Sequence, residues 1–199
     1  MILKTQFSET VRLFDDASLT KIIEMGESNI EPAKIDSTEA NEKDHRLSSV
    51  SWFKRNAETE FFYKPLLQMI YLENINNGWN FEYDAFEDLQ FTKYEGSKKQ
   101  HYDWHADQRS LPYAPNDVSE VLRGKIRKIS FSIILNTDYI GGNFEFELGS
   151  PHEKNRNEVL TPKLGCAIVF PSFTFHRVTP VTEGTRYSLV GWICGKPYR

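Results

Sequence analysis

The chain has 199 residues, of which 39% are hydrophobic and 26% charged, with a formal net charge of −4. These values are typical of a soluble globular protein of one domain, here residues 1–199, and the lack of a long basic run argues against a dominant nucleic-acid-binding face. No stretch approaches the roughly 18 apolar residues that a membrane span needs, so we expect no membrane partner.

Two stretches between about residues 8 and 75 have the apolar spacing of amphipathic helices. In SETVRLFDDASLTKIIEMGESN the spacing places six residues on one side: Val11, Leu13, Phe14, Leu19, Ile22 and Ile23. The second stretch is AETEFFYKPLLQMIYLENINNGW, in which Pro65 predicts a kink or a helix start nearby. The polar segment between them, EPAKIDSTEANEKDHRLSSVSW, is predicted to be a long loop. We expect its residues 31–47 to order as a lid when substrate binds.

From residue 80 the apolar period changes to two, in short segments rich in β-branched and aromatic residues. They are bounded by Gly, Pro and Asn, as in an antiparallel sandwich or barrel. The segments are WNFEYDAF, LQFTKYEG, QHYDWHAD, KISFSIILN, GGNFEFEL, GCAIVFPS, TFHRVTP and RYSLVGWIC. This pattern predicts an α+β, mainly β fold: a double-sheet, cupin-like jelly roll over about residues 80–195, supported by helices over about residues 8–75.

The stretch HYDWHAD places His105 and Asp107 two positions apart. On a strand such side chains project from the same face, as two ligands of one metal ion can. His176, in PSFTFHRVTP, offers a third ligand. Two imidazoles and one carboxylate on one face of an octahedron leave positions open, as in non-haem Fe(II) oxygenases, whereas a structural zinc site is normally closed by four protein ligands. His101 and Asp103 are alternative ligands on the same strand.

Ten residues after His176, RVTPVTEGTRYSL predicts a strand, a turn at Glu183–Gly184 and a returning strand. Alternation along the returning strand places four residues on one face: Arg186, Ser188, Val190 and Trp192. If His176 points into the same space, Arg186 and Ser188 suit a carboxylate, since an arginine fork binds one bidentately. A dicarboxylate could then chelate the metal at one end and pair with Arg186 at the other. The weaker alternative for Arg186 is a surface salt bridge.

These residues resemble the HxD…H…RxS pattern of Fe(II)- and 2-oxoglutarate-dependent dioxygenases. Within that superfamily, QHYDWHAD resembles a Q-x-Y-x-x-H-x-D stretch of prolyl 4-hydroxylases and of the prolyl/lysyl hydroxylase-like branch. DYIGGNFEF is similar to their Gly-Gly turn, and FPSFTFHRVTPVTEGTRYSLVGWI to their C-terminal signature. The resemblance is close over about residues 90–193. It is loose over residues 45–90, where HRLSSVSWF resembles an R-x-S…W segment, and is absent from the first forty residues.

The resemblance implies a double-stranded β-helix that hydroxylates a C–H bond and releases succinate and CO2. It implies three iron ligands, which are also the catalytic residues: His105, Asp107 and His176. It implies three residues that bind 2-oxoglutarate: Arg186, Ser188 and Tyr94. It implies three that contact the substrate's proline or the neighbouring backbone: Tyr102, Arg127 and Trp192. The implied cofactors are Fe(II), 2-oxoglutarate and O2, and ascorbate is left open.

Several alternatives stay open at this point. Tyr94 and Tyr102 can be packing aromatics, Trp192 can close the barrel, and Arg127 can be an exposed basic residue. The substrate is expected to be a prolyl residue in a peptide or protein. The alternatives are another peptidyl residue, such as lysine, or a free amino acid, whereas nucleic-acid demethylation fits the net charge of −4 poorly.

Two rival readings come from other functional classes. One is a non-enzymatic metal-binding jelly-roll sensor module, which has no physical need for the Arg186-x-Ser188 pair. The other is a zinc hydrolase, for which Asp103 is the candidate general base.

The two cysteines, Cys166 and Cys194, have no CxxC spacing. This usage fits a reducing compartment. The start of the chain, MILKTQFSETVRLFDD, has acidic residues too early for a signal peptide. We therefore expect a cytoplasmic protein.

Overall fold

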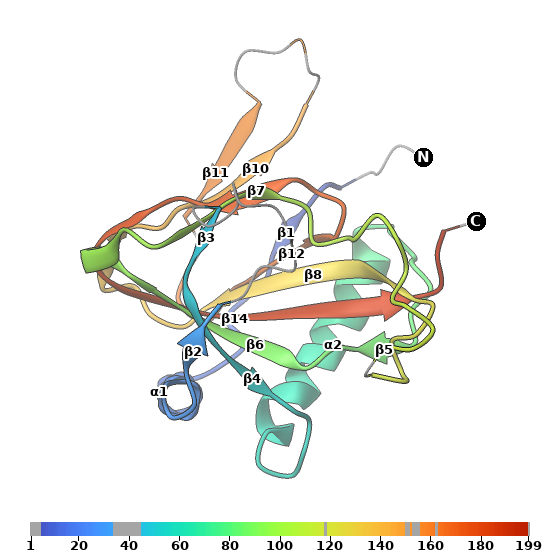
Figure 1. Ribbon diagram of the computed structural model, residues 1–199, viewed down its shortest axis with the longest axis horizontal. Coiled ribbons are helices and arrows are strands. Elements are labelled where there is room, and N and C mark those ends of the chain that lie inside the picture. The colour runs from blue at the N-terminus through green and yellow to red at the C-terminus, as the bar shows by residue number, and fades with distance from the viewer. Residues whose placement is uncertain are drawn as a thin grey trace.

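The computed structural model describes residues 5–33, 45–117, 119–149, 152, 156–161 and 163–198. Over these residues the chain forms two antiparallel sheets that face each other, with two helices along the outer face of the larger sheet (Figure 1). The expectation of a mainly β jelly roll with N-terminal helices is therefore confirmed. No helix in the described ranges has the length and apolarity needed to cross a membrane.

The larger sheet has nine strands within the described residues. Seven run in the order β1 (Ser8–Glu9), β12 (Ala167–Pro171), β8 (Ile126–Ile134), β14 (Val181–Gly195), β6 (Leu89–Glu95), β4 (Ser49–Phe53) and β2 (Glu31–Pro32). Two short strands also pair with β14, namely β5 (Ala85–Phe86) and β9 (Tyr139–Gly141). The predicted strand WNFEYDAF is thus reduced to its last two residues.

The smaller sheet has five strands in the described part of the chain. Their order is β11 (Asn157–Leu160), β10 (Phe144–Glu147), β13 (His176–Val178), β7 (His101–His105) and β3 (Arg46–Leu47). A short 3-10 helix, η2 (Gly96–Lys98), connects β6 of the larger sheet to β7 of the smaller one. This connection brings His105, at the end of β7, and Asp107, just after it, over the inner face of the larger sheet.

The two helices bury their apolar sides against the outer face of the larger sheet. Helix α1 (Asp16–Glu27) begins after Asp15, whose side chain accepts a hydrogen bond from the backbone amide of Ser18. Helix α2 (Glu60–Asn76) contains Pro65, so this proline does not mark the helix start. The shared core joins helical and strand residues: Leu19, Ile22, Phe62, Leu66, Ile70, Phe91, Phe131 and Leu189.

The prediction that the first helix extends back to residue 8 is wrong. Ser8–Glu9 pairs with β12, and the Leu13 amide donates to the Gly165 carbonyl, so this segment follows the sheet edge. Val11, predicted to lie on the apolar side, is 82% exposed. The physical reason is local, because Asp15 caps the helix and leaves the preceding residues to pair with β12.

The predicted long loop is shorter than expected. Strands β3 and β4 occupy its last part, and β2 its first two residues. Residues 34–44 lie outside the described residues, and they form most of the segment on which the predicted lid depends. β-Branched and aromatic residues in SSVSWF alternate between the two faces of β4, which explains why this part pairs with β6.

The predicted turn at Glu183–Gly184 is also wrong. The chain turns earlier, between β13 and β14, and β14 runs from Val181 straight through Gly184. Gly184 has a φ of 71°, and a Cβ there would lie 2.4 Å from the Asp138 carbonyl oxygen. A glycine with positive φ is a turn signal in sequence, but here it pairs with Tyr139 of β9, directly after the register shift between Val181 and Glu183. Strands β13 and β14 therefore belong to different sheets and do not form a hairpin.

A tight contact between α1 and β6 gives a first test of this packing. A Cβ on Gly26 would lie 2.4 Å from Cγ of Phe91, a ring with no solvent exposure. We expect Gly26→Ala to destabilise the protein by about 1–3 kcal/mol through overpacking, although alanine favours a helix by about 1 kcal/mol. Urea unfolding would measure this, with Thr20→Ala on the exposed side of α1 as control. Equal or higher stability of Gly26→Ala would contradict the packing described.

Candidate active site

A pocket of about 520 Å³ lies between the two sheets. The predicted iron ligands line it from the smaller sheet, and the predicted co-substrate and substrate residues line it mainly from the larger one. His105 ends β7 and is the cross-strand partner of His176 in β13. Asp107 lies in the irregular segment directly after β7. Strand pairing therefore brings together two histidines that are far apart in sequence.

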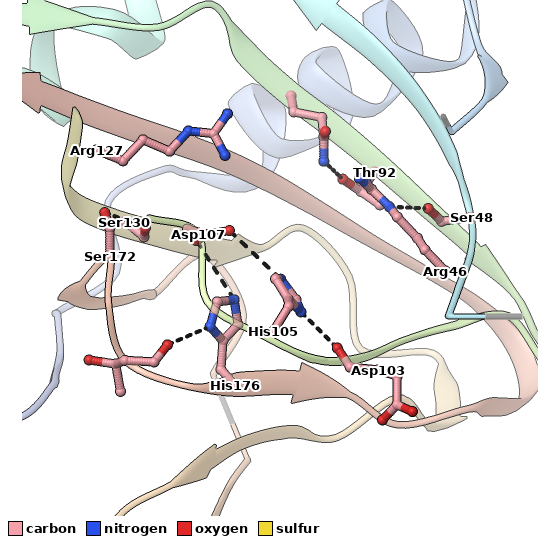
Figure 2. A network of polar contacts seen from close by, with 12 residues as sticks. Arg46, Ser48, Thr92, Asp103, His105, Asp107, Arg127, Ser130, Ser172 and His176 are labelled. Carbon is pink, nitrogen blue, oxygen red and sulfur yellow. Dashed lines mark hydrogen bonds and ion pairs between the residues drawn. The ribbon is translucent and has the colours of Figure 1, made fainter. Parts of the chain in front are cut away.

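The three side chains converge on one point. Nε2 of His105 lies 3.7 Å from Oδ1 of Asp107, and Nε2 of His176 lies 3.7 Å from Oδ2 (Figure 2). One ligand atom from each residue falls within 4.8 Å of the others. A single metal ion bound to all three atoms needs separations of this order, given metal–nitrogen and metal–oxygen distances of about 2.0–2.2 Å.

Backbone contacts orient both imidazoles for coordination. Nδ1 of His105 lies 2.7 Å from the Asp103 carbonyl oxygen, and Nδ1 of His176 lies 3.0 Å from the Thr174 carbonyl oxygen. A carbonyl can only accept, so each Nδ1 carries the proton and each Nε2 presents its lone pair toward Asp107. Burial lowers the pKa of His105 to about 3, so this ring is neutral at pH 7, as a metal ligand must be.

This donor set fits Fe(II). Two neutral imidazole nitrogens and one carboxylate on one side of the metal position leave the pocket side open for further ligands. In the described residues no thiolate or second carboxylate joins the cluster. Their role as ligands stays a prediction, but the geometry meets its requirements.

The predicted co-substrate arginine is completely buried. Arg186 has 0% exposure, and its Nη1 donates to Ser188 Oγ at 3.1 Å. Its Nε and Nη2 have no hydrogen-bond partner among the described residues. A buried guanidinium with two unpaired N–H groups is costly unless an anion satisfies it, and a carboxylate matches its fork. The far carboxylate of 2-oxoglutarate would meet this need.

Tyr94 lies beside this guanidinium. It is the cross-strand partner of Arg186 in β6, and Cζ of Arg186 lies 5.5 Å from the centroid of its ring. Burial raises the pKa of the Tyr94 phenol above its ordinary value, so the hydroxyl stays protonated and able to donate. Its ring also packs in a second apolar cluster of the fold, so the packing interpretation is confirmed, and a role in binding 2-oxoglutarate stays a prediction.

Strand β14 runs along the pocket and contributes lining residues at both of its ends. Arg186, Ser188, Val190 and Trp192 all line the cavity, as alternation predicted. Trp192 follows Arg186 by six positions along the strand, a span of about 20 Å at about 3.3 Å per residue. The co-substrate position and the substrate wall are therefore placed along one strand.

Two of the three predicted substrate residues are in contact, and the third lies beside the metal position. Cζ of Arg127 lies 3.9 Å from the centroid of the Trp192 ring, a cation–π contact. Arg127 Nε and Nη2 donate to the two carboxylate oxygens of Glu87 at 2.8 and 2.7 Å. Arg127 is thus a largely buried, ion-paired residue, and the alternative of an exposed basic residue is wrong. Tyr102 stacks on His105 with ring centroids 3.5 Å apart.

Sequence reasoning missed Glu87 and Arg46. Glu87 accepts four hydrogen bonds, two from Arg127, one from the Tyr113 hydroxyl at 2.7 Å and one from the Cys194 thiol at 3.1 Å. Only the fold brings these partners together, and no local motif marks them. Arg46 lines the pocket from β3. Its one sequence signal was the R-x-S…W resemblance of HRLSSVSWF.

The alternative ligands lie apart from the metal position. Asp103 is exposed, and its carboxylate accepts from the backbone amide of Trp104. It therefore does not stand beside the open side of the metal position, which removes the general base that a zinc hydrolase would need. His101 does not line the pocket, and neither does the exposed His152.

Known proteins resemble this chain in sequence and in fold. The profile of the 2OG-Fe(II) oxygenase superfamily matches residues 89–194. A PKHD-type hydroxylase of Acaryochloris marina is 38% identical over 90 residues, which are 43% of this chain and 38% of that protein. The chain spans less than half the length of such curated relatives.

Two solved structures share the fold. A Pseudomonas putida prolyl-4-hydroxylase superposes with a TM-score of 0.71 at 18% identity, over 96% of this chain and 94% of its own. A Trichoplax adhaerens prolyl hydroxylase, solved with a hypoxia inducible factor oxygen degradation domain peptide fragment, has a TM-score of 0.69 at 15% identity, over 94% and 83% of the two chains. At these identities the likeness shows the fold alone.

The family match covers more than half of the chain, and it includes every site residue predicted from the sequence. The same residues line one pocket in which two histidines and an aspartate converge beside a buried arginine. The chain therefore belongs to the 2OG-Fe(II) oxygenase superfamily, enzymes that use Fe(II), 2-oxoglutarate and O2.

Proposed function

We propose that this oxygenase hydroxylates a C–H bond of a prolyl residue in a peptide or protein and releases succinate and CO2. The observation that carries the proposal is the single pocket that holds the His105–Asp107–His176 cluster, the unpaired guanidinium of Arg186 and the Arg127–Trp192 wall. His105, Asp107 and His176 would hold Fe(II), and Arg186, Ser188 and Tyr94 would bind 2-oxoglutarate.

The bound metal, with 2-oxoglutarate and O2, supplies the oxidising chemistry. The chain supplies positioning and exclusion of water. Backbone carbonyls fix both imidazole rings, so the metal position cannot shift without moving β7 and β13. Arg186 and Ser188 would hold the far carboxylate of the co-substrate from β14.

The substrate assignment rests on the pocket wall and on the named relatives. Trp192 and Tyr102 offer aromatic surfaces for a pyrrolidine ring, and Arg127 offers N–H groups near a peptide carbonyl. The two structural neighbours named above are prolyl hydroxylases, and one was solved with a peptide fragment. Another peptidyl residue, such as lysine, or a free amino acid is the alternative within the same chemistry. A non-enzymatic sensor module, the other alternative, has no use for the buried Arg186.

Arg127→Gln tests the substrate wall. We expect the KM for a proline-rich peptide to rise about tenfold or more, because a charge-assisted contact is lost, while the KM for 2-oxoglutarate stays unchanged. The single variant should also lose about 3 kcal/mol of stability, since Glu87 stays buried without its ion pair. The double variant Arg127→Gln, Glu87→Gln should regain stability and keep the high KM. An unchanged peptide KM in both variants would contradict the assignment.

A cytoplasmic location is also part of the proposal. Cys166 and Cys194 are both buried and free, a usage that fits a reducing compartment. Recovery of the native protein in an extracellular or periplasmic fraction would contradict it.

A further inference from the structure

Arg46 is one of four arginines that line the pocket, with Arg109, Arg127 and Arg186. It lies on β3, directly opposite Tyr102 of β7, and its Cζ lies 4.6 Å from the centroid of the Tyr102 ring. Its Nε donates to Ser48 Oγ at 3.0 Å, which fixes the plane of the guanidinium (Figure 2). Tyr102 in turn stacks on His105. Arg46 is therefore ordered, and only one aromatic ring separates it from a predicted metal ligand.

The end of this guanidinium lacks a partner. Nη2 of Arg46 is buried and has no hydrogen-bond partner among the described residues. Glu31 and Asp117 also line the pocket, but neither carboxylate pairs with this Nη2 group. A buried N–H group of a charged side chain that stays unsatisfied costs free energy, and a bound ligand would remove that cost.

The charges of the pocket show what kind of ligand is missing. In the proposed loaded site, Fe(II) and Arg186 are balanced by Asp107 and the two carboxylates of 2-oxoglutarate. Arg127 is balanced by Glu87 through a bidentate ion pair. Arg46 has no ion-pair partner among the described residues, and the other charged side chains of the lining, Glu31, Arg109 and Asp117, are exposed or half-buried. The position beside Arg46 thus favours a substrate group that brings a negative charge.

We propose that Arg46 binds a carboxylate of the substrate close to the C–H bond that is hydroxylated. The inference rests on the proposed function and adds a substrate class to it. The carboxylate can be the α-carboxylate of a free amino acid or of a C-terminal residue, or the side chain of an acidic residue next to the target. In each case Arg46 is a specificity-determining residue, and Ser48 positions it.

Binding of paired small ligands tests the proposal without turnover. The protein is loaded with Mn(II) and 2-oxoglutarate under anaerobic conditions, and calorimetry compares N-acetylproline with N-acetylprolinamide. The same acid–amide pairs of leucine and lysine keep the result independent of the prolyl assignment. Doubly capped peptides with Glu or Gln beside proline form a separate arm for the acidic side chain.

We expect the acid to bind at least about tenfold more tightly than the amide, or the Glu peptide to bind at least about tenfold more tightly than the Gln peptide. One charge-assisted hydrogen bond provides a difference in affinity of this size. Arg46→Gln should bring that ratio close to one and leave the affinity for 2-oxoglutarate unchanged, and Arg46→Lys should keep part of the ratio. Arg123→Gln, in an exposed ion pair with Glu120, should behave like the unmodified protein.

Each other outcome is decisive. Equal binding within every pair, or no binding by any ligand, overturns the carboxylate proposal, and so does a ratio that survives in Arg46→Gln. A loss of 2-oxoglutarate affinity in Arg46→Gln would instead assign Arg46 to the co-substrate. A ratio seen with leucine or lysine but not with proline would keep the role of Arg46 and refute the prolyl substrate. Proline ligands that bind equally as acid and amide, with no ratio in any other pair, would refute the role of Arg46 and leave the prolyl substrate in place.

Discussion

Replacing His176 with alanine is expected to abolish succinate formation and to weaken Fe(II) binding by at least about 100-fold. The variant removes one of three donor atoms, and the remaining pair, His105 and Asp107, holds a divalent ion far less tightly. The imidazole also cannot be replaced by a neighbour, since the other lining residues near it are the phenylalanines Phe144 and Phe170. Equilibrium binding of Fe(II) or Co(II) to the purified protein measures the loss.

Two further variants separate coordination from folding. Asp107→Asn keeps the size of the side chain but removes its negative charge, so it should lose metal affinity while its metal-free stability stays near that of the unmodified protein. His152→Ala, at an exposed position outside the pocket, should change neither quantity. Full metal affinity in His176→Ala would refute the assignment of this residue as a ligand.

Replacing Arg186 with methionine is expected to change function and stability in opposite directions. The affinity for 2-oxoglutarate should fall by about 100-fold or more, because a bidentate, charge-assisted contact is lost. The protein without 2-oxoglutarate should become more stable by about 1–4 kcal/mol, because a buried cation with two unpaired N–H groups is replaced by an apolar side chain of similar length. Calorimetry with Mn(II) and urea unfolding measure the two effects.

A role in folding alone would give a different result. If Arg186 stabilised the fold through the Ser188 contact, the methionine variant would be less stable and would lose 2-oxoglutarate only as it unfolds. Ser188→Ala serves as the matched control, since it removes the one hydrogen bond that the guanidinium makes within the described residues. We expect a smaller loss of 2-oxoglutarate affinity in Ser188→Ala than in Arg186→Met.

The part of the site that the sequence predicted depends on short-range regularities. Alternation along a strand places Arg186, Ser188 and Trp192 on one face whatever the rest of the fold does. HxD spacing brings His105 and Asp107 close together, although Asp107 lies after the strand and not on it. The third ligand, His176, was reached through its chemistry and through resemblance, because its distance from His105 is set by the pairing of β13 with β7.

The features that the sequence could not predict depend on long-range contacts. Glu87 is recognisable only once β8 and β14 bring Arg127 and Cys194 to it. The first helix was predicted too long because the apolar spacing continues through residues that pair with β12 at the sheet edge. Gly184 looked like a turn because a glycine with positive φ serves equally well at a bulge within a strand.

Succinate formation by the purified protein, with Fe(II), 2-oxoglutarate and O2, tests the central claim most directly. The assay is run with and without a proline-rich peptide, and with His176→Ala as the inactive control. The account predicts turnover that the peptide stimulates and that the control lacks. Turnover without stimulation by the peptide would retain the oxygenase chemistry and reject the prolyl substrate. No succinate under any metal-loaded condition, or equal succinate from His176→Ala, would contradict the account.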